Sequence, residues 1–157
     1  MNSELNRRLD EERELLEDLK AAMLEHHEAL RAQEPERIGR ALQGNLESVE
    51  ACRMARERRD KHVADLLRIG GRDPAGGMKG LLEIYADGAA RALREKIDGI
   101  GDLSRVIRII NTRNRELAEH GLDLLHGDFK VLAELVSETA DRPGEDGGSG
   151  KLLSMRA

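Results

Sequence analysis

Apolar residues recur every seven positions along most of the chain, and this repeat constrains the fold more than any other feature. Two sets of positions, three and four residues apart, form one narrow seam on a helix over residues 4–32. One set is Leu9, Leu16, Met23 and Leu30, and the other is Leu5, Glu12, Leu19 and His26. β-branched residues are few, which disfavours a sheet. The pattern predicts long helices that pair along apolar seams.

A second helix is predicted over residues 35–69, after a tight reversal at Gln33, Glu34 and Pro35. Proline disfavours the α conformation in the residue before it and suits the first position of a helix. A kink within one continuous helix is the alternative. The repeat continues in two sets: Leu42, Val49, Arg56, Val63 and Ile38, Asn45, Cys52, Arg59, Leu66. Residues 1–34 are net acidic and residues 35–72 net basic, which favours an antiparallel hairpin of the two helices.

Glycine pairs around Asp73-Pro74 predict a loop over residues 70–77, followed by a third helix over residues 78–139. We expect a kink near Gly99–Gly101, because interior glycine weakens a helix. The seam of this helix comprises Ile100, Leu103, Ile107, Ile110, Asn114, Leu117, Gly121, Leu124, Asp128, Val131 and Leu135. At its core-type position Asn114 is expected to fix the register of the helices. Residues 141–157 are Gly-rich and charged, which predicts a disordered tail.

These segments predict an all-α fold, an antiparallel helical hairpin or coiled-coil bundle of about three long helices. The helical domain spans residues 1–140, and the disordered C-terminal tail spans residues 141–157. The terminal sequence KLLSMRA is either a short docking segment or simply part of that tail.

A second apolar stripe accompanies the seam of the third helix. It comprises Ala118, Leu122, Leu125, Phe129, Leu132 and Val136, at steps of four and three. Residues 117–136 therefore present two adjacent apolar columns where a simple coiled coil needs one seam. Either the stripe packs inside the same molecule, or it binds the helix of a partner protein, because large apolar patches rarely stay uncovered on a monomer.

Composition excludes several other functions. The net charge of −5 and the two aromatic residues, Tyr85 and Phe129, disfavour a general nucleic-acid binder. The basic run 53–61 is interrupted by acids and is interpreted as a solvated face opposite the acidic first helix. The five histidines match no metal-ligand spacing, no nucleophile–His–acid set is evident, and Cys52 lies in a seam as a buried thiol. We therefore expect neither an enzyme nor a cofactor.

The sequence also lacks a secretory signal and an apolar run long enough for a membrane helix. A soluble, cytoplasmic protein without membrane insertion is therefore expected.

Two stretches resemble the FlgN-type flagellar export chaperones. The first, LLEDLKAAMLEHHEALRAQEPERIGRALQGNLESVEACRMARERRDKHVADLL at residues 15–67, is similar to the paired opening helices of that family. The second, NTRNRELAEHGLDLLHGDFKVLAEL at residues 111–135, is similar to its N-x-x-N-x-x-L stretch and the amphipathic helix that follows. Together they cover about half of the chain, in the order and at the spacing of the family.

The resemblance implies a type III flagellar export chaperone without ATPase activity. Such proteins bind hook–filament junction (hook-associated) proteins, cover their terminal amphipathic helices against premature assembly, and present them to the flagellar export gate. On this chain the cargo-binding face would be Leu122, Leu125, Phe129, Leu132 and Val136. Family members are often richer in aromatic residues here, and Gly121, Gly127 and Asp128 interrupt the face. The alternative is a structural or adaptor coiled-coil protein without an export role.

Overall fold

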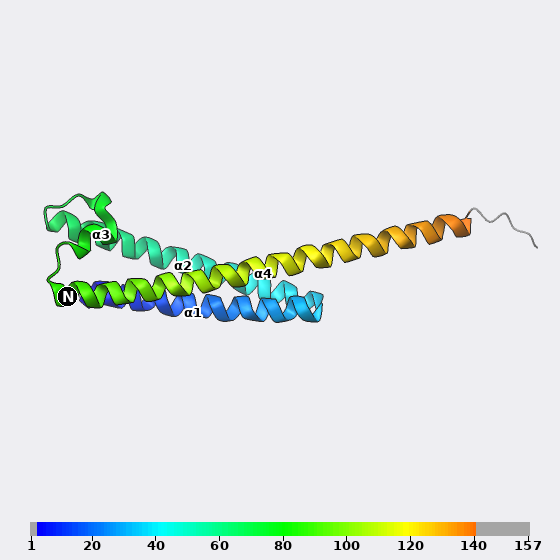
Figure 1. Cartoon of the computed structure of the whole chain (residues 1–157), viewed down its shortest axis with the longest axis horizontal. Helices are drawn as coiled ribbons and strands as arrows, with labels where there is room; N and C mark the ends of the chain where they lie inside the picture. The colour runs from blue at the N-terminus through cyan, green and yellow to red at the C-terminus, as the bar shows by residue number, and fades with distance from the viewer. Residues whose placement is uncertain (1–2, 141–157) are drawn as a thin grey trace, which may run out of the picture. The chain divides into compact units, whose positions relative to one another are not determined.

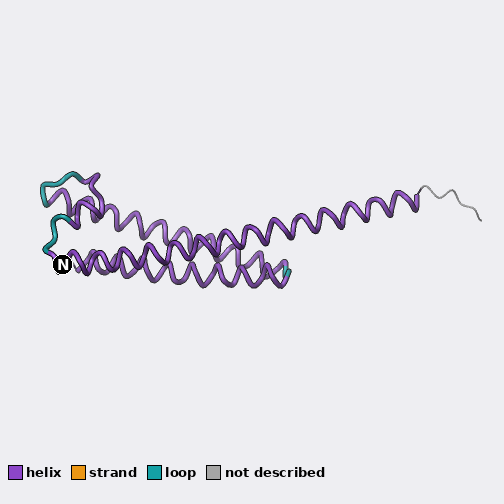
Figure 2. The backbone as a smooth tube through the Cα atoms, viewed as in Figure 1, coloured by secondary structure: helices purple, strands orange, loops and turns teal. Residues whose placement is uncertain are grey.

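The structure, a computed structural model, describes residues 3–140, leaving out the side chains of Asp87 and of residues 135–140. Its elements are α1 (Ser3–Ala32), α2 (Pro35–Ile69), the 3₁₀ turn η1 (Pro74–Gly76), α3 (Gly77–Leu82) and α4 (Asp87–Ala140), as labelled in Figure 1. The described residues contain no strand (Figure 2), which confirms the all-α prediction. The predicted tail lies outside the described residues. The chain divides into two compact units, Met1–Ala118 and Glu119–Ala157.

The reversal between α1 and α2 is confirmed at the predicted residues. Gln33 takes a left-handed φ of 55°, Glu34 is extended, and Pro35 begins α2. Arg37 Nε donates to Glu25 at 2.6 Å, and Arg59 Nη1 donates to Glu12 at 2.5 Å. Because later residues of α2 pair with earlier residues of α1, the two helices form an antiparallel hairpin.

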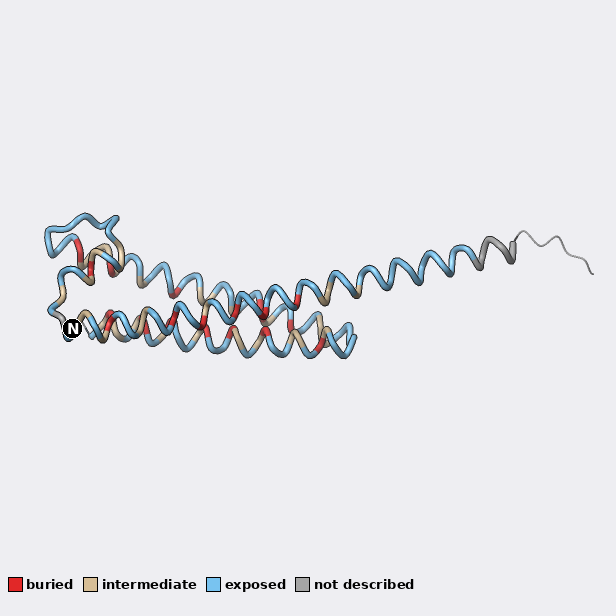
Figure 3. The backbone as a smooth tube through the Cα atoms, viewed as in Figure 1, coloured by how far each residue is buried: buried red, intermediate tan, exposed pale blue. Residues whose placement is uncertain are grey.

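The first part of α4, within the unit Met1–Ala118, packs parallel to α1. Lys96 Nζ lies 2.5 Å from Asp10 Oδ1, and Asn114 Nδ2 donates to the Met23 carbonyl at 2.9 Å, so residue numbers rise together along the two helices. Their seams meet in one apolar core that also takes residues from α2 and α3. Figure 3 marks the buried positions along these helices in red. The core residues are Leu5, Leu9, Leu16, Leu19, Met23, Val63, Leu67, Leu81, Leu93, Ile100, Leu103, Ile107 and Ile110.

One of the two columns predicted for α2 is only partly confirmed, since Val63 is buried in the core but earlier members of the column are not. Leu42 and Val49 are exposed by 47% and 45%, and Ala41 and Ala55, each one position earlier than a predicted seam residue, are buried instead. Asn45, of the other predicted column, is buried as expected. The inner face of α2 is therefore rotated toward its alanines. Small side chains there leave room for the larger leucines of α1.

The predicted helix over residues 78–139 is two helices. α3 ends at Leu82, and the chain turns through residues 83–86 before α4 begins. Leu81 is buried and Tyr85 packs against the same core, so tertiary burial at this end of the unit overrides local helix propensity. The helix α4 runs without a break through Gly99–Gly101, and the interruption of the predicted helix lies before α4.

A polar layer ties the three helices together at one level of the unit Met1–Ala118. Asn114 is 3% exposed, and its Oδ1 lies 2.9 Å from His27 Nδ1. Asn45 Nδ2 donates to His26 Nδ1 over 3.1 Å. Adjacent histidines of α1 therefore bond to different helices, His26 to α2 and His27 to α4. Such bonds are made in one alignment of the helices, which supports the predicted register role of Asn114.

Acidification is expected to weaken the fold through His26. Partial burial lowers the pKa of His26, so the unfolded chain takes up a proton before the folded chain does. The free energy of unfolding should therefore fall as pH drops below about 6.5, the ordinary histidine value, and go on falling to the lowered folded pKa. Urea unfolding at about pH 7.5 and about pH 5.5 measures this loss. His26→Gln should reduce it; an unchanged loss in that variant would assign it to other groups.

Candidate functional site

The seam of α4 changes character along the helix. From Leu93 to Asn114 it is buried in the unit Met1–Ala118, at helical spacing. Beyond that unit, every described residue from Leu122 to Glu134 is exposed (Figure 3). Apolar side chains at the same spacing continue into this exposed segment.

The residues predicted to bind cargo lie along this exposed helix. Leu122, Leu125, Phe129 and Leu132 are exposed by 57%, 55%, 68% and 56%. Their spacing of three and four residues places them in one row along α4. The side chain of Val136 lies outside the described residues. The structure thus brings four of the five predicted residues into one accessible row.

Two further residues widen this row into a face. Leu124 and Val131 were assigned by the heptad repeat to the seam, yet they are exposed by 49% and 55%. They lie beside Leu125 and Leu132, so both columns of the repeat are accessible here. We name Leu122, Leu124, Leu125, Phe129, Val131 and Leu132 the C-terminal apolar face. The doubled column in the sequence was the signal that could have identified these two residues.

The C-terminal apolar face has the chemistry of a helix-binding surface. Its side chains come from one straight run of helix, at the i, i+3, i+4, i+7 positions that helical partners use. Burying them would contribute about 1.5–3 kcal/mol each, against the cost of association and ordering. Gly121 adds an open position on the same side, because no atom lies within 4 Å of the place a Cβ would take.

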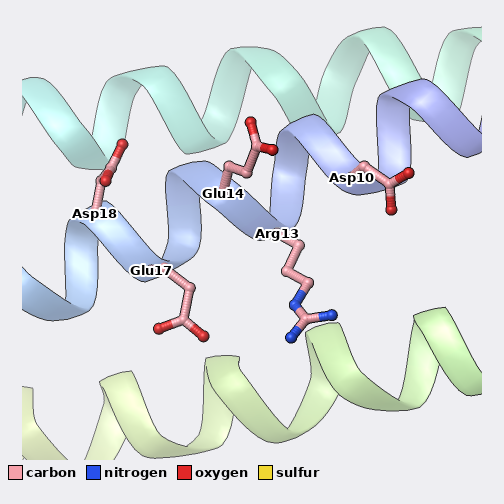
Figure 4. Close-up of a pocket in the computed structure, with 5 residues that line it drawn as sticks. All are labelled: Asp10, Arg13, Glu14, Glu17 and Asp18. Carbon is pink, nitrogen blue, oxygen red and sulfur yellow. The ribbon is translucent and has the colours of Figure 1, made fainter.

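A shallow hollow on α1 is not arranged for chemistry. It is lined by Asp10, Arg13, Glu14, Glu17 and Asp18, all from one helix. Figure 4 shows these side chains pointing to different sides, Arg13 and Glu17 one way and Glu14 and Asp18 another. A catalytic site needs groups that converge on one reacting atom. These residues are interpreted as a solvated acidic face.

The basic run of α2 is occupied by acidic partners. Arg58 pairs with Glu11 at 2.6 Å, and both Arg56 and Arg59 approach Glu12. Arg53 pairs with Glu50 and Glu57 on its own helix. This confirms the interpretation of the run as a face opposite the acidic first helix.

The described residues also hold no reactive cysteine and no metal-binding cluster. Cys52 is half-buried, its Sγ donates to the Leu15 carbonyl at 3.3 Å, and burial raises the pKa of its thiol. A raised thiol pKa reduces the reactive thiolate. Among these residues no three His, Cys, Asp or Glu side chains gather as metal ligands would. None of the described helices is both long and apolar enough to cross a bilayer.

Comparison with known proteins gives one positive result. Residues 1–140 match the family of FlgN proteins. No curated protein and no solved structure matches the chain.

Proposed function

The chain belongs to the FlgN family, whose members are flagellar export chaperones, and we propose that it binds hook-associated junction proteins through its C-terminal apolar face. The bound segment is a terminal amphipathic helix of the cargo. Covering that helix prevents the junction proteins from assembling before they are exported. This complex forms in the cytoplasm, and the chaperone then delivers the cargo to the type III export gate.

The exposure of the C-terminal apolar face is the observation that supports this proposal. Cargo helices of this kind assemble with one another through apolar stripes, so a chaperone must offer a competing stripe. Leu125 and Phe129 offer such a stripe on one helical row, each more than half exposed. Helix-in-groove packing would bury the apolar faces of both partners together.

Mixing the purified full-length chain with purified hook-associated proteins from the same bacterium tests the proposal. Size-exclusion chromatography with light scattering should show that the chain, as a monomer or dimer, forms a stoichiometric complex with a junction protein. The alternative, a structural or adaptor coiled coil, predicts that the chain forms a long stable oligomer and binds none of the junction proteins. That second result would overturn the proposal.

A further inference from the structure

Asp128 lies in the middle of the C-terminal apolar face. The four positions one helical turn away are Leu124, Leu125, Val131 and Leu132, which are the neighbours a helical residue has on its own face. All four are exposed, by between 49% and 56%. A carboxylate therefore interrupts the face at its centre, where a partner covering both columns would have to cover it.

The helix itself offers Asp128 no compensating charge. Basic side chains are absent from the positions three and four residues away, and Lys130, two residues away, points to another side of the helix. Between Asp128 and the other described residues there is no hydrogen bond or ion pair. Asp128 is exposed, so its carboxylate is accessible to water in the free protein.

Covering the face removes that water. An ionised carboxylate moved into an apolar contact without a partner is strongly disfavoured, whereas a cation placed beside it offsets much of the cost. A partner helix with an apolar or acidic residue opposite Asp128 would therefore bind weakly. A partner with a basic residue there would bind in one register.

From this arrangement we infer that Asp128 is a specificity determinant, and that the helix bound by the C-terminal apolar face carries a lysine or arginine within its own apolar stripe, opposite Asp128. The inference rests on the proposed function in one respect, namely that this face binds a helical segment. It adds the chemistry by which one amphipathic helix is selected over others. Apolar side chains supply attraction, and the charge pair supplies discrimination.

Synthetic amphipathic peptides test the inference with the full-length chain. Each is a Leu-based helix of about 20 residues, or about 30 Å. One position of its apolar stripe is lysine, methionine or glutamate, and a short series moves that position along the stripe. Fluorescence anisotropy measures the affinities. For the best-placed position, the lysine peptide should bind the wild-type chain about tenfold or more tightly than its methionine counterpart, and the glutamate peptide should bind weakest.

Variants of the chain identify the residue responsible. With Asp128→Asn, which keeps the shape and removes the charge, the preference for lysine should fall to about twofold or less. With Asp128→Lys the glutamate peptide should become the tighter ligand. Asp123→Asn is the matched control: its neighbours one turn away are Glu119, His120, His126 and Gly127, so it lies on the polar side and should leave the preference unchanged.

The outcomes separate this inference from the proposed function. Methionine peptides that bind as tightly as lysine peptides would overturn the role of Asp128 and leave a helix-binding face intact. Failure of every peptide to bind would overturn the inference as well. Complex formation with intact hook-associated proteins decides the proposed function independently of both results.

Discussion

Substituting Leu125→Asp together with Phe129→Asp is expected to abolish binding of hook-associated proteins without unfolding the chain. The two side chains are exposed by 55% and 68%, so the free protein gives up little apolar burial when they become acidic. In the complex the loss is larger, because two apolar contacts of about 1.5–3 kcal/mol each disappear and two carboxylates are desolvated. Affinity should fall by about a thousandfold or more.

Isothermal titration with a purified junction protein measures this loss, and circular dichroism and urea unfolding check the fold. The matched control is Leu42→Asp with Leu46→Asp on α2. Those leucines are also four residues apart and exposed, by 47% and 59%, but they belong to the other unit of the chain. The control pair should leave cargo affinity within about twofold of wild type. If both double variants lost the same affinity, or if the Leu125→Asp, Phe129→Asp variant kept its affinity, the cargo would bind elsewhere on the chain.

The parts of the fold that were predictable from sequence are those fixed by strong local signals. The seam of α1 has leucine or methionine at most of its positions, so its inward face is unambiguous. The reversal before α2 follows from Pro35, which constrains both its own φ and the residue before it.

Other parts depend on packing that a repeat does not specify. On α2, a heptad reading favours Leu42 over Ala41 because leucine is the larger apolar residue, yet burial goes to the alanine. The leucines of α1 leave limited space at this level, and that space decides whether residue 41 or residue 42 of α2 points toward α1. Likewise, residues 83–86 themselves contain neither glycine nor proline, and the break there follows from the burial of Leu81 and the packing of Tyr85.

The sequence predicted where along the chain the exposed apolar row lies, but it predicted too few of the exposed apolar residues. Sequence periodicity identifies two apolar columns over residues 117–136, and it assigns one of them to the seam. The structure exposes Leu124 and Val131 of that column as well. Periodicity gives the direction of a side chain around the helix axis, but it does not show what lies against that direction. Asp128 gains its central place on the face only once both columns are accessible.

The antiparallel hairpin contains a buried charge whose removal should have the second large effect. The side chain of Glu12 is 2% exposed within the apolar seam of α1. Its carboxylate accepts from Arg59 Nη1 at 2.5 Å, and Arg56 Nε lies 3.6 Å away. The Arg59 side chain is itself only 15% exposed, and it also bonds Asp60. The pair lies at one level of α1 and α2 and therefore favours one alignment of the hairpin.

Glu12→Ala should lower the free energy of unfolding by about 3 kcal/mol, because it leaves the Arg59 guanidinium partly buried beside a cavity. The expected loss is at the lower end for a broken buried pair, since Asp60 still compensates some of the charge. Replacing both partners, Glu12→Leu with Arg59→Leu, should change stability by about 1 kcal/mol or less, because neither desolvated charge remains. Urea unfolding of the two variants at neutral pH measures the difference. Equal destabilisation by both would mean that packing at this level, and not the ion pair, holds α1 against α2.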